Sequence, residues 1–274
     1  MCSEAFEQWP FARVCAAMRL AGYSGIEIAP FTLAEKPADI TPAGRREYRD
    51  AMASEGLEFV GLHWLMRSPK GLHVTAPDAG LRRRSWNHVR ELVDLSADLG
   101  PNSIMVFGSP GERRTVDSLS RAEATRHFVD GLSSIAPHAQ SRGVAVLVEA
   151  LPVSQCDVVE TLEEAAHVVR EIGSPAVRTM FDVHNAVDER EPHPALVERH
   201  FDLIRHVHVN ELDGRHCGAA EAHPGYDFKP LFEVLARRCY TGWISLETFD
   251  FSYGPERIAC DSLRHLELEI AQLT

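Results

Sequence analysis

The stretch Val144-Ala-Val-Leu-Val-Glu-Ala150 is an apolar, β-branched run that ends in a carboxylate, Glu149. Three later runs repeat this design and also end in polar side chains, at residues 177–184, 204–211 and 243–249. Each run is short and bounded by turn residues, which is typical of a buried strand rather than a helix. A carboxylate without a partner at the end of a buried strand is energetically costly unless a positive charge lies next to it. The four runs therefore predict a site for a divalent metal with mostly oxygen ligands.

The alternation of strands and helices along the chain indicates the fold class. We expect eight strands, at residues 1–6, 25–29, 57–63, 102–107, 144–150, 177–184, 204–211 and 243–249. We expect eight helices, at residues 9–20, 42–55, 81–99, 117–141, 162–172, 194–201, 228–238 and 255–273. Strict alternation implies a parallel sheet, and eight units imply an α/β fold that closes into a (β/α)8 TIM barrel, a single domain over residues 1–274. An open doubly wound sheet is the alternative, but its Gly-rich nucleotide turn is missing after the first strand.

The seventh expected strand supports a barrel independently. By the period of two, His206, His208 and Asn210 lie on one face of this strand, while Val207 and Val209 lie on the other. The valine face suits a layer of helices. The polar face needs a polar interior, which the mouth of a barrel supplies.

Composition excludes several classes of protein. The chain has 274 residues, 45% of them hydrophobic, and a net charge of −12, which disfavours a nucleic acid as the main partner. It contains no apolar run long enough to cross a bilayer and no secretory signal segment, so we expect a cytoplasmic protein without a membrane partner. The six cysteines are scattered without CxxC spacing, which indicates reduced, buried thiols rather than disulfides.

Five motifs carry a resemblance to a known family: Val148-Glu-Ala-Leu-Pro152, Phe181-Asp-Val-His184, His206-Val-His-Val-Asn-Glu211, Pro224-Gly-Tyr-Asp-Phe228 and Leu246-Glu247. With these motifs the chain resembles the xylose isomerase-like TIM barrels. That superfamily contains sugar isomerases and epimerases, hydroxypyruvate isomerase, inosose dehydratase and DNA repair enzymes of the endonuclease IV type. The resemblance spans nearly the whole chain, and the last four strand ends are its most specific part.

The resemblance implies a metal-dependent sugar isomerase or epimerase. Its metal ligands would be Glu149, Asp182, His208 and Glu247, and the metal would be Mn²⁺ first, with Mg²⁺, Co²⁺ or Zn²⁺ as alternatives. Glu149 and Glu247 would also be catalytic: one removes a proton beside the carbonyl and the other returns it, through a cis-enediolate. The implied partners are a small-molecule sugar and further copies of the chain, as a dimer or tetramer.

The physical chemistry agrees with these roles. A proton next to a carbonyl is too weak an acid for a free carboxylate at pH 7, and a divalent ion that polarises the carbonyl oxygen lowers the barrier by several kcal/mol. Two carboxylates that flank the carbon can then transfer the proton, each contributing roughly 10²- to 10⁴-fold. Three carboxylates and one imidazole favour Mn²⁺, Mg²⁺ or Co²⁺ over a structural zinc ion.

Three further residues are candidates for substrate binding. Many relatives read Asp-x-x-His at the sixth strand, whereas this chain reads Asp182-Val-His184, so His184 is expected to bind substrate or to support the metal ligands. Relatives place an arginine after the seventh strand, and Arg215 is the nearest match. His63 ends the third strand and is the third candidate.

Other functions use related residues. A dehydratase acting on a polyol-derived keto compound would use the same metal and carboxylates. An endonuclease IV-like DNA repair enzyme would need a trinuclear zinc cluster with more histidines, and the strand that ends at Phe107-Gly108 carries none there. A sugar-binding barrel without activity would have no need for two metal-binding glutamates. An isomerase or epimerase is therefore the leading hypothesis.

Overall fold

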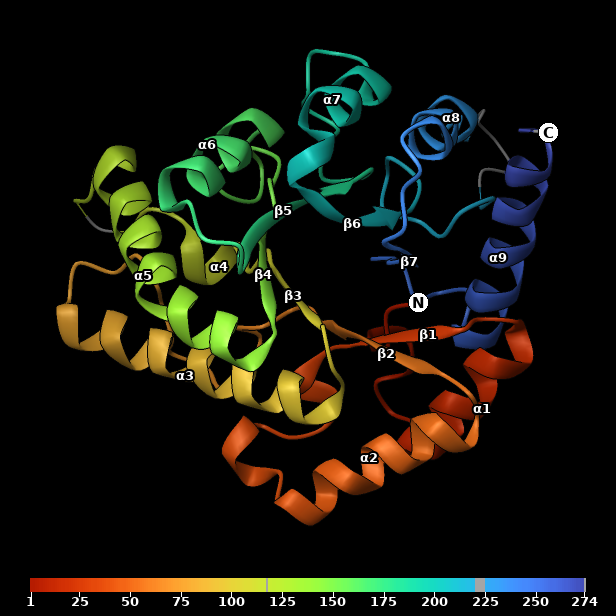
Figure 1. The fold of residues 1–274 in the computed structure, drawn as a ribbon, viewed down its shortest axis with the longest axis horizontal. Coiled ribbons are helices and arrows are strands. Elements are labelled where there is room, and N and C mark those ends of the chain that lie inside the picture. The colour runs from red at the N-terminus through yellow and green to blue at the C-terminus, as the bar shows by residue number, and fades with distance from the viewer. Residues whose placement is uncertain (117, 220–224, 274) are drawn as a thin grey trace.

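The computed structural model describes residues 1–116, 118–219 and 225–273. Asp117, in the fourth expected helix, and Pro224, in one of the five motifs, lie outside these residues. The described chain forms one parallel sheet in which each strand pairs with the next in sequence order (Figure 1). The strands are β1 (Gly25–Ile28), β2 (Glu58–Leu62), β3 (Ile104–Phe107), β4 (Ala145–Val148), β5 (Val177–Asp182), β6 (Ile204–Val209) and β7 (Trp243–Leu246).

Helices surround this sheet on the outside (Figure 1). The α-helices are α1 (Phe11–Ala21), α2 (Pro42–Ser54), α3 (Ala79–Leu99), α4 (Pro110–Arg113), α5 (Arg121–Arg142), α6 (Leu162–Ile172), α7 (His193–His200), α8 (Lys229–Arg237) and α9 (Pro255–Ala271). Short 3₁₀ turns are η1 (Glu4–Phe6), η2 (Pro30–Thr32), η3 (Pro37–Asp39) and η4 (Phe201–Leu203). The predicted barrel is confirmed, and all eight expected helices are present. The short helix α4 was not expected, because residues 108–111 look like a simple turn.

The first of the eight expected strands, for which residues 1–6 leave room only as a short one, is reduced in the described residues to a single bridge. Cys2 pairs in parallel with Glu27 of β1, and its N–H donates to the carbonyl of Leu246 in β7 at 2.9 Å. The N–H of Ser3 donates to the carbonyl of Glu27, also at 2.9 Å. The turn η1 then bends the chain away at Glu4. The barrel is therefore closed by a seam of about three residues between β1 and β7.

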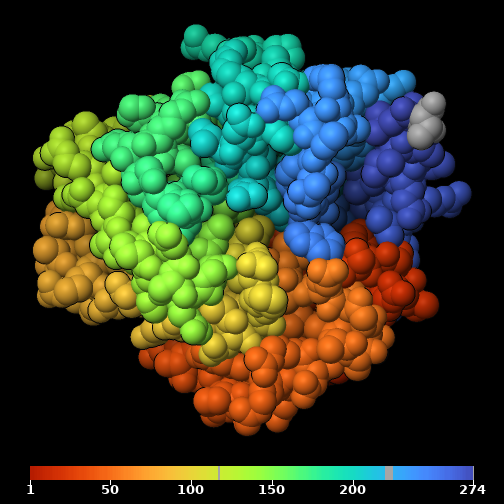
Figure 2. Space-filling view, viewed as in Figure 1, coloured from red at the N-terminus to blue at the C-terminus, as the bar shows by residue number. Residues whose placement is uncertain are grey.

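The N-terminal segment meets the C-terminal part of the chain at this seam. Helix α1 packs against helix α9, and the red N-terminal and blue C-terminal parts lie against each other in the space-filling view (Figure 2). The seam thus joins segments that are more than 200 residues apart in the sequence.

The two faces of β6 confirm the predicted division between a polar interior and an apolar exterior. His206 and His208 are fully buried and both bond to Glu27 of β1 across the inside of the barrel. Val207 and Val209 are also fully buried, and they belong to the apolar core under the helices. The two histidines therefore share one buried carboxylate inside the barrel, while the apolar layer between strands and helices supplies most of the hydrophobic burial.

Local sequence signals set the helix ends. The side chain of Ser120 accepts from the backbone N–H of Glu123 while the Glu123 side chain bonds back, a capping box that starts α5. Gly143 ends the same helix with φ 70°, a left-handed conformation that glycine adopts without strain. Such ends place the following strand at a defined position, which matters at β4 because Glu149 follows it.

The remaining sequence expectations concern thiols and membranes. All six cysteines are free; four are buried as expected, but Cys239 and Cys260 are exposed. No helix in the described part of the chain combines the length and the apolar character that a membrane span requires.

Candidate metal centre and active-site cavity

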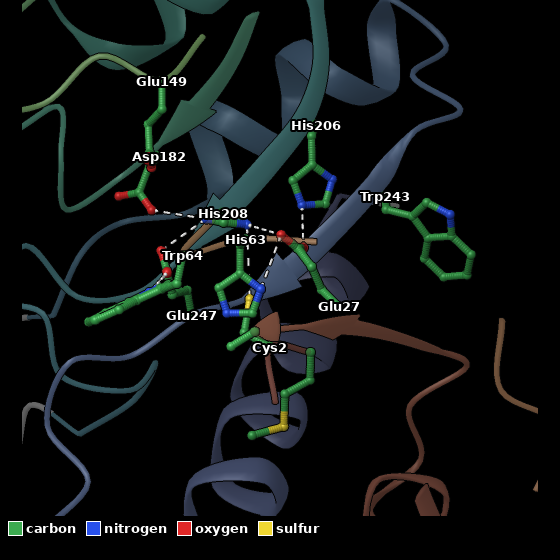
Figure 3. A network of polar contacts seen from close by, with 12 residues as sticks. Cys2, Glu27, His63, Trp64, Glu149, Asp182, His206, His208, Trp243 and Glu247 are labelled. Carbon is green, nitrogen blue, oxygen red and sulfur yellow. Dashed lines mark hydrogen bonds and ion pairs between the residues drawn. The ribbon is translucent and has the colours of Figure 1, made fainter. Parts of the chain in front are cut away.

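Four side chains from the carboxyl ends of adjacent strands converge inside the barrel mouth. Glu149 follows β4, Asp182 ends β5, His208 lies in β6 and Glu247 follows β7. One ligand atom of each lies within 4.8 Å of the others, and all four residues are buried (Figure 3). Parallel strands bring their carboxyl ends to one rim, which is where TIM barrels build their active sites. The structure thus brings together all four residues predicted as metal ligands.

His208 is held so that one ring nitrogen faces this cluster. Its Nδ1 lies 3.0 Å from Glu247 Oε2 and 3.4 Å from Asp182 Oδ2, while its Nε2 lies 3.1 Å from Glu27 Oε1. The second Glu27 oxygen bonds His206 Nε2 at 2.8 Å (Figure 3). A proton on Nε2, donated to Glu27, leaves the Nδ1 lone pair free for a metal. This carboxylate-to-imidazole contact is the usual way to orient a histidine ligand.

The carboxylates of the cluster are also oriented by neighbours. The Asn185 backbone N–H donates to Asp182 Oδ1 at 2.7 Å, and its side-chain amide donates to Glu149 Oε1 at 2.9 Å. The Trp64 indole N–H donates to Glu247 Oε1 at 2.8 Å. Sequence reasoning missed the roles of Asn185 and Trp64. Their adjacency to His184 and His63 was the available signal, but it does not specify which atom each side chain reaches.

Gly108, directly after β3, leaves room for the Glu149 carboxylate. A Cβ at this position would stand 2.2 Å from Glu149 Oε2, closer than any non-bonded contact. Underneath, the fully buried Arg113 donates to the carbonyls of Phe107 and Glu149 at 3.0 and 2.9 Å. The absence of a side chain at Gly108 and the buried guanidinium of Arg113 therefore both define the position of Glu149.

Replacing Gly108 by Ala is expected to lower kcat by about 10²-fold, because the new methyl group displaces the Glu149 carboxylate by roughly 1 Å. Steady-state kinetics with Mn²⁺ in excess would measure the effect. Gly111→Ala is the matched control, since a Cβ there meets nothing within 4 Å. Equal kinetics for the two variants would contradict this account of Gly108.

The electrostatics of the cluster call for a cation. Burial, then the charges of Glu247 and Asp182, raise the pKa of Glu149 to about 8. Burial and Asp182 also raise the pKa of Glu247, although His208 opposes the shift. Three carboxylates packed in a buried site repel one another unless a positive charge lies among them. The donor set of three carboxylates and one imidazole therefore fits a divalent ion.

Metal binding is expected to tighten as pH rises from 6 to 8. Because the pKa of Glu149 is raised to about 8, the metal-free protein carries a proton there at neutral pH, and the incoming ion must displace it. The affinity then rises by up to about tenfold per pH unit for each proton released. Calorimetric titration with Mn²⁺ in two buffers of different ionisation enthalpy would count the protons. Glu112→Gln, outside the cluster, should keep the same slope; an affinity independent of pH would contradict the assignment.

A cavity of about 440 Å³ opens beside the cluster. Its wall includes Glu149 and Glu247 of the four-residue cluster and the aromatic rings of Trp64 and Phe249. The other polar and charged residues of the wall are His63, Arg67, Lys70, Glu112, Gln155, His184 and Asn185. This volume lies in the range of about 300–1,000 Å³ that small-molecule sites occupy. The cavity thus joins the predicted catalytic carboxylates to a space large enough for a small-molecule ligand.

The three predicted substrate residues are placed differently. His184 lines the cavity, with Nδ1 held by the Leu212 carbonyl at 2.7 Å and its ring against Phe249 at 4.9 Å. His63 also lines it, but its Nε2 lies 2.6 Å from Glu4 Oε2. Arg215 is not among the described lining residues, and its guanidinium pairs with Asp213 at 2.7 Å. The substrate contacts of all three stay predictions.

Trp64 combines backbone strain with a contact to a predicted catalytic group. Its φ of 53° is unusual for a bulky residue, and such strain is concentrated at functional sites. The ring lies 6.4 Å from that of Phe249, so the two aromatic side chains form one wall of the cavity. This aromatic wall lies next to Glu247, the predicted catalytic carboxylate.

Trp64→Phe is expected to lower kcat by about tenfold, because Glu247 loses a hydrogen bond of roughly 1.4 kcal/mol while the ring stays in place. Phe249→Leu, which alters the same wall without touching Glu247, should act mainly on KM. Steady-state kinetics separates the two effects, and an unchanged kcat in Trp64→Phe would refute the role of this contact.

Comparison with known proteins assigns the family. The family model described as "Xylose isomerase-like TIM barrel" matches residues 15–268. The chain belongs to this family. The sequence expectation drawn from the strand-end motifs is therefore confirmed.

Individual relatives in this family are distant. Fructoselysine 3-epimerase from Shigella flexneri is 21% identical over 234 residues, covering 82% of this chain and 80% of that protein. Inosose dehydratase from Geobacillus thermodenitrificans (strain NG80-2) is 25% identical over 139 residues, covering 44% of this chain and 45% of that protein. The crystal structure of D-psicose 3-epimerase in the presence of D-fructose superimposes with a TM-score of 0.81 at 18% identity, covering 97% of this chain and 95% of that one. At this identity the structural likeness shows the fold.

Proposed function

We propose that the protein is a divalent-metal-dependent sugar epimerase or isomerase that transfers a proton next to the carbonyl of a ketose or aldose. The observation that carries this proposal is the position of two buried glutamates, Glu149 and Glu247. They belong to one four-residue cluster and line the same 440 Å³ cavity. Two carboxylates at one reacting carbon are what a reversible proton transfer needs. The match to a sugar epimerase over four fifths of the chain supports the same reaction class.

The side chains have separable roles in this reaction. Glu149, Asp182, His208 and Glu247 would hold the ion, which supplies polarisation of the substrate carbonyl. One of the two glutamates takes the proton from the carbon beside the carbonyl, and the other gives a proton back, through a cis-enediolate. Trp64 holds the Glu247 carboxylate by its N–H, and Asn185 holds that of Glu149. The carboxylates are thereby aligned before substrate binds, which lowers the cost of reaching the reactive geometry.

The metal in this proposal is Mn²⁺ first, with Mg²⁺, Co²⁺ or Zn²⁺ as alternatives, because carboxylate oxygens dominate the donor set. His63 and His184 are the candidate substrate contacts in the cavity wall. A dimer or tetramer, a cytoplasmic location and the absence of a nucleic-acid partner stay predictions from the sequence.

Hydrogen exchange in D₂O tests the reaction class. The Mn²⁺-loaded protein would be incubated with D-fructose, D-psicose, D-tagatose, L-ribulose and fructoselysine, and each mixture followed by NMR. Deuterium at a carbon next to the carbonyl, together with a new sugar and no loss of water, is the expected result. Absence of exchange in every substrate of this panel, and in a wider set of ketoses and aldoses, would refute the proposal.

A dehydratase is the second candidate, because the aligned part of inosose dehydratase covers 44% of this chain. It would use the same carboxylates to remove a proton, but water would leave the neighbouring carbon. Incubation with inosose in D₂O separates the two candidates: loss of water without a new epimer would favour the dehydratase.

A further inference from the structure

The seam that closes the barrel carries a second group of ligand-type side chains. Cys2 lies in the seam, Glu27 lies in β1 and His63 follows β2, and each is at most 1% exposed. One ligand atom of each residue lies within 4.8 Å of the other two. This group borders the first cluster, because Glu27 Oε1 lies 3.1 Å from His208 Nε2, but the two groups share no residue (Figure 3).

The ring of His63 shows why the group needs a cation. Its Nε2 lies 2.6 Å from Glu4 Oε2, so the Nε2–H donates to that carboxylate. Its Nδ1 is buried without a hydrogen-bond partner in the described residues and lies 3.7 Å from Glu27 Oε1. In this tautomer a nitrogen lone pair faces a carboxylate oxygen in a fully buried place. Such an arrangement is repulsive unless a positive charge lies between the two atoms.

A proton on Nδ1 is the simpler source of that charge, but it fits the distances less well. A 3.7 Å separation of nitrogen and oxygen is too long for a hydrogen bond. A nitrogen and an oxygen ligand of one tetrahedral ion, with bonds of about 2.0–2.2 Å, lie roughly 3.3–3.5 Å apart. The observed separation is therefore closer to that of two ligands of one ion than to a hydrogen bond.

We propose that Cys2, Glu27 and His63 form a second metal site, suited to Zn²⁺. A thiolate, an imidazole and a carboxylate are the ligands that zinc accepts, and the sulfur sets this site apart from the oxygen-rich centre at the barrel mouth. Water can complete the coordination, because His63 also lines the cavity. The site is additional to the proposed function and does not rest on it.

The position of this site gives the ion a structural task. In the described residues, one β-bridge, at Cys2, joins the N-terminal segment to β1. A few backbone hydrogen bonds add to it and reach β1 and β7. An ion on Cys2, Glu27 and His63 cross-links the N-terminal segment, β1 and β2, where the ladder is shortest. Glu27 Oε1 also lies 3.1 Å from His208 Nε2. An ion bound to Glu27 therefore also fixes the residue that orients His208, a proposed ligand of the metal at the barrel mouth.

Cobalt titration tests the second site, since Co²⁺ binds as Zn²⁺ does and its bond to a thiolate gives a charge-transfer band. The metal-free full chain would be titrated with Co²⁺, followed by absorption and by the cobalt content after gel filtration. Two ions per chain and a thiolate band are expected for the unsubstituted protein. Cys2→Ser is expected to bind one ion and to lose the band.

Two control variants sharpen the experiment. Cys260→Ser removes an exposed thiol of α9 and should keep both ions and the band. Glu149→Gln weakens the first centre and should keep the band, so that failure of the first centre and failure of the second give different results. One ion per chain without a thiolate band in the unsubstituted protein overturns the second site, as does a band that survives in Cys2→Ser. Because the first of these results needs no variant, misfolding of Cys2→Ser leaves the test decisive.

Discussion

Glu149→Gln is expected to lower kcat by about 10⁴-fold, the largest effect of any single substitution considered for this protein. The change keeps the size of the side chain but removes both a proton-transfer group and a metal-ligand charge. It also places a side-chain amide at the position where Glu149 Oε1 now accepts a hydrogen bond from Asn185 at 2.9 Å. Circular dichroism should show an intact fold, because glutamine has nearly the size of glutamate and adds no charge to the buried cluster.

The measurement is turnover of the best substrate from the D₂O screen, with Mn²⁺ raised until the rate no longer changes. That condition separates lost metal affinity from lost chemistry. Glu91→Gln, an exposed change on α3, serves as the control for the loss of one carboxylate. Turnover in Glu149→Gln at the rate of the unsubstituted protein would show that Glu149 takes no part in the proton transfer.

Removal of the metal is expected to reduce turnover to background, and Mn²⁺ should restore it. The reason is that the cluster at the barrel mouth cannot polarise a carbonyl by its own charges, which are mainly negative. Dialysis against a chelator, metal analysis and readdition of Mn²⁺, Mg²⁺ or Co²⁺ would measure this. Full activity in protein shown to be free of metal would exclude a metal-dependent mechanism.

The same metal removal has a predictable effect on stability. In the metal-free protein the pKa of Glu149 is raised from 4.5 to about 8, so the folded state holds a proton that the unfolded state releases. The free energy of unfolding of the metal-free protein should therefore fall as pH rises through this window. Bound metal opposes the loss, with a stabilisation of about 2.7 kcal/mol at a hundred times Kd. Thermal melts at pH 6 and pH 8, with and without Mn²⁺, would show a larger metal effect at pH 8; the reverse order would contradict the raised pKa.

The closeness of the four predicted metal ligands could be foreseen from the sequence, because strand periodicity and parallel topology leave little freedom in where strands end. The choice of these four residues came from the family resemblance. Glu149, Asp182 and Glu247 end or follow buried strands, and His208 shares a face with His206 by the period of two. Once the strands are parallel and adjacent, their carboxyl ends meet at one rim. The prediction needed no knowledge of the loops.

The residues that orient these ligands were not predictable in the same way. Trp64, Asn185 and Gly108 act through the direction of one N–H or through the absence of one methyl group. Those details depend on loop backbone angles, such as the φ of 53° at Trp64, that no short-range pattern specifies. The family resemblance suggested Arg215 as a substrate contact, and the structure shows it paired with Asp213 in its loop, so its contact with substrate stays a prediction.

By itself, the sequence determined the order of strands and helices, the closed parallel sheet and the strand ends that carry the predicted metal ligands, because these follow from local periodicity and from the rules of parallel topology. Only the tertiary structure decided how the barrel closes. The first expected strand, at residues 1–6, is only a single bridge in the structure, where Cys2 pairs with Glu27 and bonds to the carbonyl of Leu246. Contacts between residues more than 200 positions apart carry no local signal, so the seam and the buried group around it could be found only in three dimensions.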